Sequence, residues 1–141
     1  MRRSLGPWVL KDGKYSFRDQ IVLHYLEWRW WEHCEEYVQT GTPLRVHQTM
    51  TDEDWAVYQR GMRSGLEMPA RWVARHLPLL RTARHMLDIG GSHGYFSVAI
   101  CRRYPQLGST VLDLPEAIRH AAPLLAKKEW EVGSFIARGT P

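Results

Sequence analysis

The spacing of hydrophobic residues changes near residue 85 and divides the chain into two stretches of different character. Before residue 85, apolar side chains recur at helical intervals, which is typical of amphipathic helices. The expected helices run over 17–39, 51–65 and 69–80, with Pro78 distorting the last turn of the third. The first stretch is therefore predicted to be mainly helical.

After residue 85, short apolar runs alternate with helical patterns. The expected elements are a strand over 86–89, a helix over 93–103, a strand over 109–112, a helix over 115–126 and a third strand near 129–132. Strands joined through helices need crossover connections, which are right-handed and produce a parallel sheet. The sequence therefore predicts an α/β fold, with a partial parallel sheet that follows a mainly helical N-terminal region.

Local signals near the N-terminus refine this outline. Trp8-Val9-Leu10 and Tyr15 flank an Asp12-Gly13 pair, which indicates a small hairpin. Ser16 with Asp19, and Thr51 with Asp54, have the spacing of capping boxes, so we expect helices to begin there.

A glycine-rich turn follows the first predicted strand, in the run Asp88-Ile89-Gly90-Gly91-Ser92-His93-Gly94. The second predicted strand also ends in an acid, Asp113. Turns without Cβ atoms allow a ligand to approach the backbone closely, and an acid one strand over can accept bonds from ribose hydroxyls. The plainer alternative is that the turn only connects strand to helix and that Asp113 caps the helix opened by Pro115.

The glycine spacing decides between cofactors. A dinucleotide fingerprint needs glycines at positions i, i+2 and i+5, but a start at Gly90 places Ser92 and Tyr95 there. A start at Gly91 fails in the same way, and the carboxylate of Asp88 would repel a pyrophosphate. S-adenosylmethionine, which has a cationic amino-acid end, an adenosine end and no phosphate, fits better.

Composition excludes several classes of protein. The chain has 141 residues, is 44% hydrophobic and 24% charged, and is therefore globular rather than disordered. Its net charge of +4 is modest and its arginines are scattered, so nucleic-acid binding is not favoured. Cys34 and Cys101 lack metal-type spacing and are expected as reduced thiols on helices, without a metal site. No apolar run is long enough to span a membrane, so we expect a cytoplasmic protein.

The run from Met86 to Ala121 resembles S-adenosylmethionine-dependent O-methyltransferases of the small-molecule class. The resemblance is carried by the turn Leu87 to Gly94 and by Val111-Leu112-Asp113-Leu114-Pro115, whose Asp-Leu-Pro is the more specific half. Upstream, Tyr58 to Met62 is similar to the helix that precedes the family's cofactor domain, and the predicted hairpin and first helix resemble the end of its winged-helix dimerisation domain.

The resemblance implies an organisation and a set of roles. Residues 1–48 would be a remnant of the winged-helix region, 49–84 linking helices, and 85–141 the start of a Rossmann-like, class I methyltransferase domain. Six residues would bind the cofactor: Asp88, Gly90, Gly91 and Gly94 at its methionine end, and Asp113 with Leu114 at its ribose. Tyr58 and Met62 would flank the substrate or methyl-donor pocket, although residues at this spacing are also common in a plain core.

Two departures from the family qualify this reading. None of the seven histidines stands at the family's catalytic position, so no catalytic residue is assigned, and His93 is expected to fill space or to hydrogen-bond locally inside the turn. Gly133-Ser134-Phe135 is similar to the end of the family's third strand, with Ser134 in place of an aspartate. The chain therefore resembles a partial methyltransferase, which we expect to be marginally stable alone and to need a second copy or a missing C-terminal segment.

The function expected from these observations is methyl transfer from S-adenosylmethionine to a hydroxyl of a small aromatic metabolite. The alternative is a non-catalytic protein, derived from a methyltransferase, that binds the cofactor or only dimerises. A third interpretation is a winged-helix module that binds nucleic acid. The absence of a clustered basic recognition helix argues against it. A nicotinamide oxidoreductase fails on glycine spacing.

Overall fold

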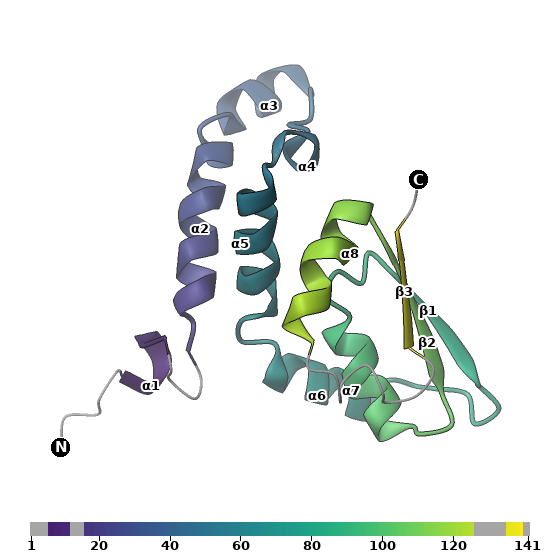
Figure 1. The fold of residues 1–141 in the computed structure, drawn as a ribbon. Helices are drawn as coiled ribbons and strands as arrows, with labels where there is room; N and C mark the ends of the chain where they lie inside the picture. The colour runs from purple at the N-terminus through teal and green to yellow at the C-terminus, as the bar shows by residue number, and fades with distance from the viewer. Residues whose placement is uncertain (1–5, 12–15, 126–134, 140–141) are drawn as a thin grey trace. The chain divides into compact units, whose positions relative to one another are not determined.

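The computed structural model describes residues 6–11, 16–125 and 135–139, which form two compact units, Met1–Ser64 and Gly65–Pro141 (Figure 1). Among these residues, no helix is both long and apolar enough to cross a membrane.

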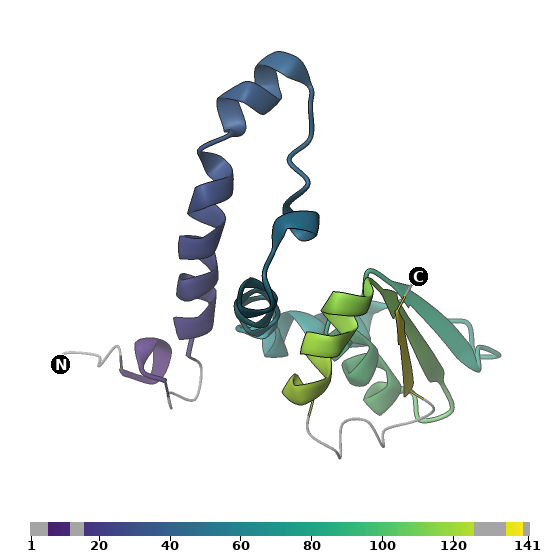
Figure 2. The same ribbon diagram turned by 45° about the horizontal axis from the view of Figure 1, so that its top comes forward.

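The first unit is helical. Its elements are α1 (Gly6–Val9), α2 (Arg18–Trp31), α3 (Cys34–Thr40), α4 (Val46–Thr49) and α5 (Asp52–Arg63). Helices α2 and α5 lie side by side in both ribbon views (Figures 1 and 2), and they bury Leu23 and Leu26 of α2 and Trp55 of α5. Gly61 lets the two helices approach closely, because a Cβ at this position would collide with the side chain of Leu23.

The predicted N-terminal hairpin is wrong at Trp8-Val9, which lie in the short helix α1; the other half of the hairpin falls on residues 12–15, outside the described residues. Pro7 suits a first helical turn, and the Leu10 amide donates to the Gly6 carbonyl at 3.1 Å, which closes that turn. The Trp8 ring then stacks on Phe17, with ring centroids 6.1 Å apart.

The single predicted helix over 17–39 is also corrected, because it consists of two helices. At the end of α2 the bonding pattern tightens: the His33 amide donates to Trp30, three residues back, and α3 begins at Cys34. Ser16 does not form the predicted capping box. Its hydroxyl accepts from the Arg18 amide at 3.2 Å, and the residue at the cap is Phe17, without a side-chain bond. The short helix α4 was not predicted.

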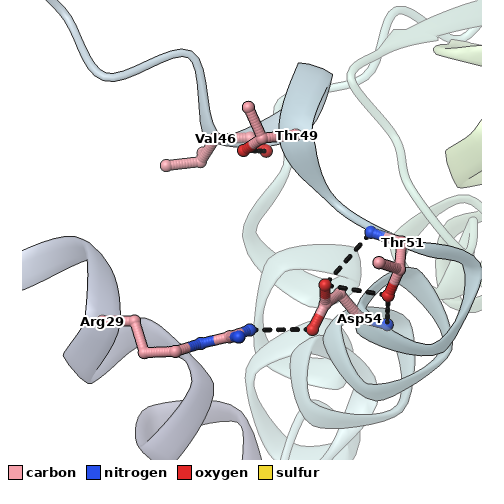
Figure 3. Close-up of polar contacts among 5 residues, drawn as sticks. All are labelled: Arg29, Val46, Thr49, Thr51 and Asp54. Carbon is pink, nitrogen blue, oxygen red and sulfur yellow. Dashed lines mark hydrogen bonds and ion pairs between the residues drawn. The ribbon is translucent and has the colours of Figure 1, made fainter.

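The capping box at the start of α5 is confirmed and also joins two helices. The Thr51 hydroxyl accepts from the Asp54 amide at 3.1 Å, and the Thr51 amide donates to Asp54 Oδ2 at 3.0 Å. Arg29 of α2 donates to the other oxygen, Oδ1, at 2.8 Å (Figure 3). Beside this cluster, the Thr49 hydroxyl bonds the Val46 carbonyl at 3.1 Å and closes the turn of α4 (Figure 3). Asp54 therefore fixes both the start of α5 and its contact with α2.

The second unit contains the sheet. Its elements are α6 (Glu67–His76), β1 (His85–Ile89), α7 (Tyr95–Arg103), β2 (Gly108–Asp113), α8 (Pro115–Ala121), a 3-10 turn (Ala122–Leu124) and β3 (Phe135–Gly139). The strands are parallel in the order β1-β2-β3, so the predicted α/β fold with a partial parallel sheet is confirmed. Helix α6 starts earlier than predicted and ends at His76, so Pro78 follows the helix instead of distorting it.

The sheet is covered on one face. Helices α7 and α8 lie on the same side of the strands (Figures 1 and 2), and Ala74, Ile100 and Leu107 form the buried core of this unit. The side chains that alternate away from the helices in β1 are exposed, Leu87 by 56% and Ile89 by 76%. Parallel sheets normally have both faces covered, whereas in the described chain this face is an exposed apolar surface.

The third strand lies later than predicted. Residues 129–132 fall outside the described residues, whereas Phe135–Gly139 forms β3 and pairs with Ser109–Asp113. Phe135 therefore begins this strand, although the sequence placed it at a strand end. The end of β3 is Gly139, opposite Asp113, so the comparison of Ser134 with an aspartate at the strand end is wrong in register.

The contacts of Asp54 predict a specific pH dependence of stability. Desolvation by burial raises the pKa of Asp54. Hydrogen bonds from Thr51 and Arg29, together with the charge of Arg29, lower this pKa by a larger amount, so the net shift is downward. Such a carboxyl stabilises the fold above the unfolded-state pKa of about 3.9 and loses that contribution as pH falls through its lower folded-state value.

We expect Asp54→Asn to lower the free energy of unfolding by about 1 kcal/mol near pH 7, the usual value of a helix cap. The difference between wild type and variant should shrink as pH falls below about 4, in thermal denaturation at a series of pH values. Glu53→Gln, which neutralises an exposed acid in the same helical turn, is the control. A difference that does not change with pH would contradict this role of Asp54.

Candidate functional site

The predicted cofactor residues of the second unit gather where β1 and β2 end. The Gly90 amide donates to the Leu112 carbonyl at 2.8 Å and continues the strand pairing into the turn. The Gly94 amide then donates to the Gly91 carbonyl at 2.8 Å, after which α7 begins at Tyr95. The carboxyl ends of parallel strands are the usual ligand-binding edge of such sheets.

Asp113 ties the two strand ends together. Its Oδ2 accepts from the Ser92 amide at 2.7 Å, and its Oδ1 accepts from the Leu114 amide at 2.7 Å. The cap residue of α8 is Leu114, which has no side-chain cap bond. The alternative prediction that Asp113 caps this helix is therefore wrong. The carboxylate instead holds the glycine turn against the end of β2, with both oxygens oriented by backbone amides.

Asp88 lies on the same face of the sheet as Asp113. It pairs in register with Val111, and Asp113 stands two residues further along β2, on the face that Val111 occupies. The Ser97 hydroxyl of α7 donates to Asp88 Oδ2 at 2.6 Å, and the Ser109 hydroxyl donates to Ser97 at 2.9 Å. Two carboxylates therefore share one edge of the sheet, beside one glycine turn.

The turn needs its glycines for two different reasons. Gly90 and Gly94 have φ values of 68° and 69°, in the left-handed region that favours glycine. Gly91 is required by space, because a Cβ there would lie 2.7 Å from Asp88 Cγ and 2.9 Å from Val111 Cγ1. Ser92 also adopts a positive φ, 52°, in which its amide reaches Asp113.

His93 is 3% exposed, and its Nδ1 accepts from the Tyr95 amide at 3.2 Å, which confirms the predicted local bond. This bond occupies the first amide of α7, which in a phosphate site would face the ligand. The turn is therefore built differently from a site that cradles a pyrophosphate.

The two predicted substrate residues belong to the first unit. Tyr58 of α5 packs among Trp30, His47 and Trp55, with ring centroids 5.5–6.3 Å from its own. Met62, one turn later, is 40% exposed. Their role toward a substrate stays a prediction, as does the partly exposed Leu114 at the ribose.

Sequence reasoning missed three serines at this site: Ser92, Ser97 and Ser109. Ser97 and Ser109 are fully buried, in a helix and a strand that are otherwise apolar on their inner sides. That break in the hydrophobic pattern was the available signal, since buried hydroxyls are kept where they have partners.

Other reactive groups lie apart from this edge. Both cysteines are free thiols, as predicted, and burial raises the pKa of the Cys101 thiol, which keeps it protonated. In the described part of the chain, no group of three or more His, Cys, Asp or Glu side chains could hold a metal ion.

The packing at Gly91 gives a direct test of the turn. We expect Gly91→Ala to lower the free energy of unfolding by about 1–3 kcal/mol, because Asp88 and Val111 would have to move to admit the methyl group. Ser92→Gly, at the adjacent position with positive φ, should change it by less than about 1 kcal/mol. Chemical denaturation measures both; equal midpoints for Gly91→Ala and wild type would contradict the close approach.

Comparisons with known proteins point to one family. A family model for an O-methyltransferase domain matches residues 31–138. A 3-hydroxy-5-methyl-1-naphthoate 3-O-methyltransferase of Streptomyces sahachiroi is 30% identical over 104 residues, which make up 68% of this chain and 29% of that protein.

Two solved structures share the fold. An O-methyltransferase family protein from Burkholderia thailandensis matches with a TM-score of 0.78 and 21% identity, over 97% of this chain and 42% of that one. Human N-acetylserotonin methyltransferase in complex with S-adenosylmethionine matches with a TM-score of 0.74 and 16% identity, over the same shares. The chain therefore spans less than half the length of these relatives. Because the family model covers most of its residues, this chain belongs to the O-methyltransferase domain family.

Proposed function

We propose that this chain carries the S-adenosylmethionine-binding part of an enzyme that methylates a hydroxyl of a small aromatic metabolite. The observation that carries the proposal is the pair of carboxylates, Asp88 and Asp113, on one face at the ends of neighbouring strands, joined by the glycine turn. The pair suits a ligand with a cation at one end and two hydroxyls nearby.

The residues present fit this cofactor. Two amides hold the Asp113 carboxylate in place. Each of its oxygens keeps a lone pair that can accept a hydrogen bond from a ribose hydroxyl. Asp88 would accept a bond from the ammonium group of the methionine end, beside Gly90, Gly91 and Gly94. Leu114, which is 40% exposed, would lie against the ribose.

The acceptor is proposed from the family. The Streptomyces relative is named for a hydroxylated naphthoate, which is a small aromatic molecule, and Tyr58 and Met62 are our candidates to line an acceptor pocket. The reaction would be an in-line displacement at the sulfonium methyl group, with a base removing the hydroxyl proton. We assign no residue of this chain to that base.

The alternative proposal is a protein that dimerises or binds the cofactor without catalysis. Helix α2 supports a dimer, because Ile21, Tyr25 and Trp28 form a stripe on one side of the helix, and Tyr25 and Trp28 are 82% and 69% exposed. We propose that this stripe, within residues 1–48 that resemble a winged-helix dimerisation region, contacts a second copy. Residues 49–84 would link it to the cofactor domain, 85–141, in a cytoplasmic protein with reduced cysteines.

Calorimetric titration with S-adenosylhomocysteine tests the cofactor proposal without knowledge of the acceptor. We expect measurable binding that Asp113→Ala weakens at least tenfold, which corresponds to about 1.4 kcal/mol. Glu116→Ala, an exposed acid nearby in α8, should bind like wild type. A wild-type chain that does not bind, or an Asp113→Ala variant with unchanged affinity, would overturn the proposal.

Sedimentation equilibrium tests the dimer. We expect the wild-type chain to self-associate and the double variant Tyr25→Ser/Trp28→Ser to weaken association at least tenfold, because truncation of central aromatic anchors commonly costs about 2 kcal/mol or more. Trp72→Ser, which removes a similarly exposed tryptophan from α6, is the control. Equal association of the double variant and the control would refute a role for this stripe.

A further inference from the structure

Two buried hydroxyls connect the interior of the second unit to Asp88. Ser97 in α7 and Ser109 in β2 both have an exposed fraction of 0%. Val98, which follows Ser97, and Val111, the next residue on the same face of β2 as Ser109, are buried as well, so both serines lie in the apolar interior.

Stability alone does not call for these serines. A buried hydroxyl costs about 1–3 kcal/mol unless it is hydrogen-bonded, and alanine at both positions would need no partner. Alanine is also the better helix former at Ser97. The pair is thus a local departure from the hydrophobic pattern, and such departures tend to occur at functional sites.

The bonds run in one direction and end on the carboxylate. Ser109 donates to Ser97 at 2.9 Å, and Ser97 donates to Asp88 Oδ2 at 2.6 Å, the length of a charge-assisted bond. The backbone of Gly91 also approaches this oxygen closely, because a Cβ there would lie 2.8 Å from Oδ2. The carboxylate is therefore clamped between α7 and the turn, and Oδ1 is the oxygen that Ser97 does not engage.

We infer that Ser97, supported by Ser109, is a positioning residue that fixes the Asp88 carboxylate to receive the ammonium group of a nucleoside amino acid bound at the turn. This inference rests on the proposed function and deepens it, since it makes the serine pair a determinant of preference for ligands that carry the amino-acid end. A fixed acceptor binds such a group better than a mobile one, because less freedom is lost on binding.

The test compares two ligands that differ in that end. S-adenosylhomocysteine carries the ammonium group, whereas 5′-methylthioadenosine keeps the nucleoside and thioether but lacks the amino acid. Calorimetry on the 141-residue chain should show that Ser97→Ala weakens binding of S-adenosylhomocysteine about five- to tenfold, the size of the usual net contribution of one hydrogen bond. Binding of 5′-methylthioadenosine should stay within about twofold.

A double-mutant cycle separates positioning from simple folding effects. If Ser97 acts through Asp88, Ser97→Ala should cause no further loss of affinity for S-adenosylhomocysteine in an Asp88→Asn background. Ser109→Ala should have a smaller effect, of about two- to threefold, because it acts through Ser97. Thr110→Ala is the matched control, since its hydroxyl bonds His85 at 2.9 Å, next to Ser109 but on the opposite face of the same strand.

The outcomes distinguish a failure of cofactor binding from a failure of the positioning role of Ser97. A wild-type chain that binds neither ligand contradicts the proposed function itself and, with it, the role of Ser97. Normal wild-type binding with equal losses for both ligands in Ser97→Ala, or with no loss at all, overturns only the positioning role. If Ser97→Ala fails to fold, Ser97→Cys, which keeps the volume and a weak donor, is measured in the same way. It should show an intermediate loss confined to S-adenosylhomocysteine, and equal losses for both ligands overturn the inference.

Discussion

The carboxylate of Asp113 is the constraint on which the site depends. It accepts from an amide in the glycine turn and from an amide in the loop after β2, and so joins the ends of two neighbouring strands. The strand register places Asp88 on the same face, where Gly91 packs directly against it. The position of each acid thus follows from the parallel pairing of two short strands and from the absence of a side chain at one residue.

Much of this arrangement is readable in the sequence, because its determinants are local. Glycines at 90, 91 and 94, acids at two strand ends and the strand–helix alternation predict the parallel sheet and the turn that the structure contains. The Thr51–Asp54 capping box is local too and is confirmed. The crossover connection makes the two strands parallel, so both acids lie at the same edge of the sheet.

The errors arise where a short pattern has two physical solutions. Three apolar residues near an Asp-Gly pair resemble a hairpin, but Pro7 starts a helical turn there instead. Helical periodicity over 17–39 does not register a two-residue break, and the bond between Ser97 and Asp88 depends on a contact between a helix and a strand. Such bonds between elements are set by packing, which composition and spacing do not report.

Binding of the cofactor at the glycine turn is tested most directly by an NMR titration of the ¹⁵N-labelled chain with S-adenosylhomocysteine. The amides of Ser92 and Leu114 donate to the carboxylate that is proposed to bind the ribose, so they should report on its occupancy. We expect the resonances of these two amides and those of Gly90, Gly91 and Gly94 to shift together and to saturate with one affinity. Saturable shifts confined to residues away from this turn would contradict it.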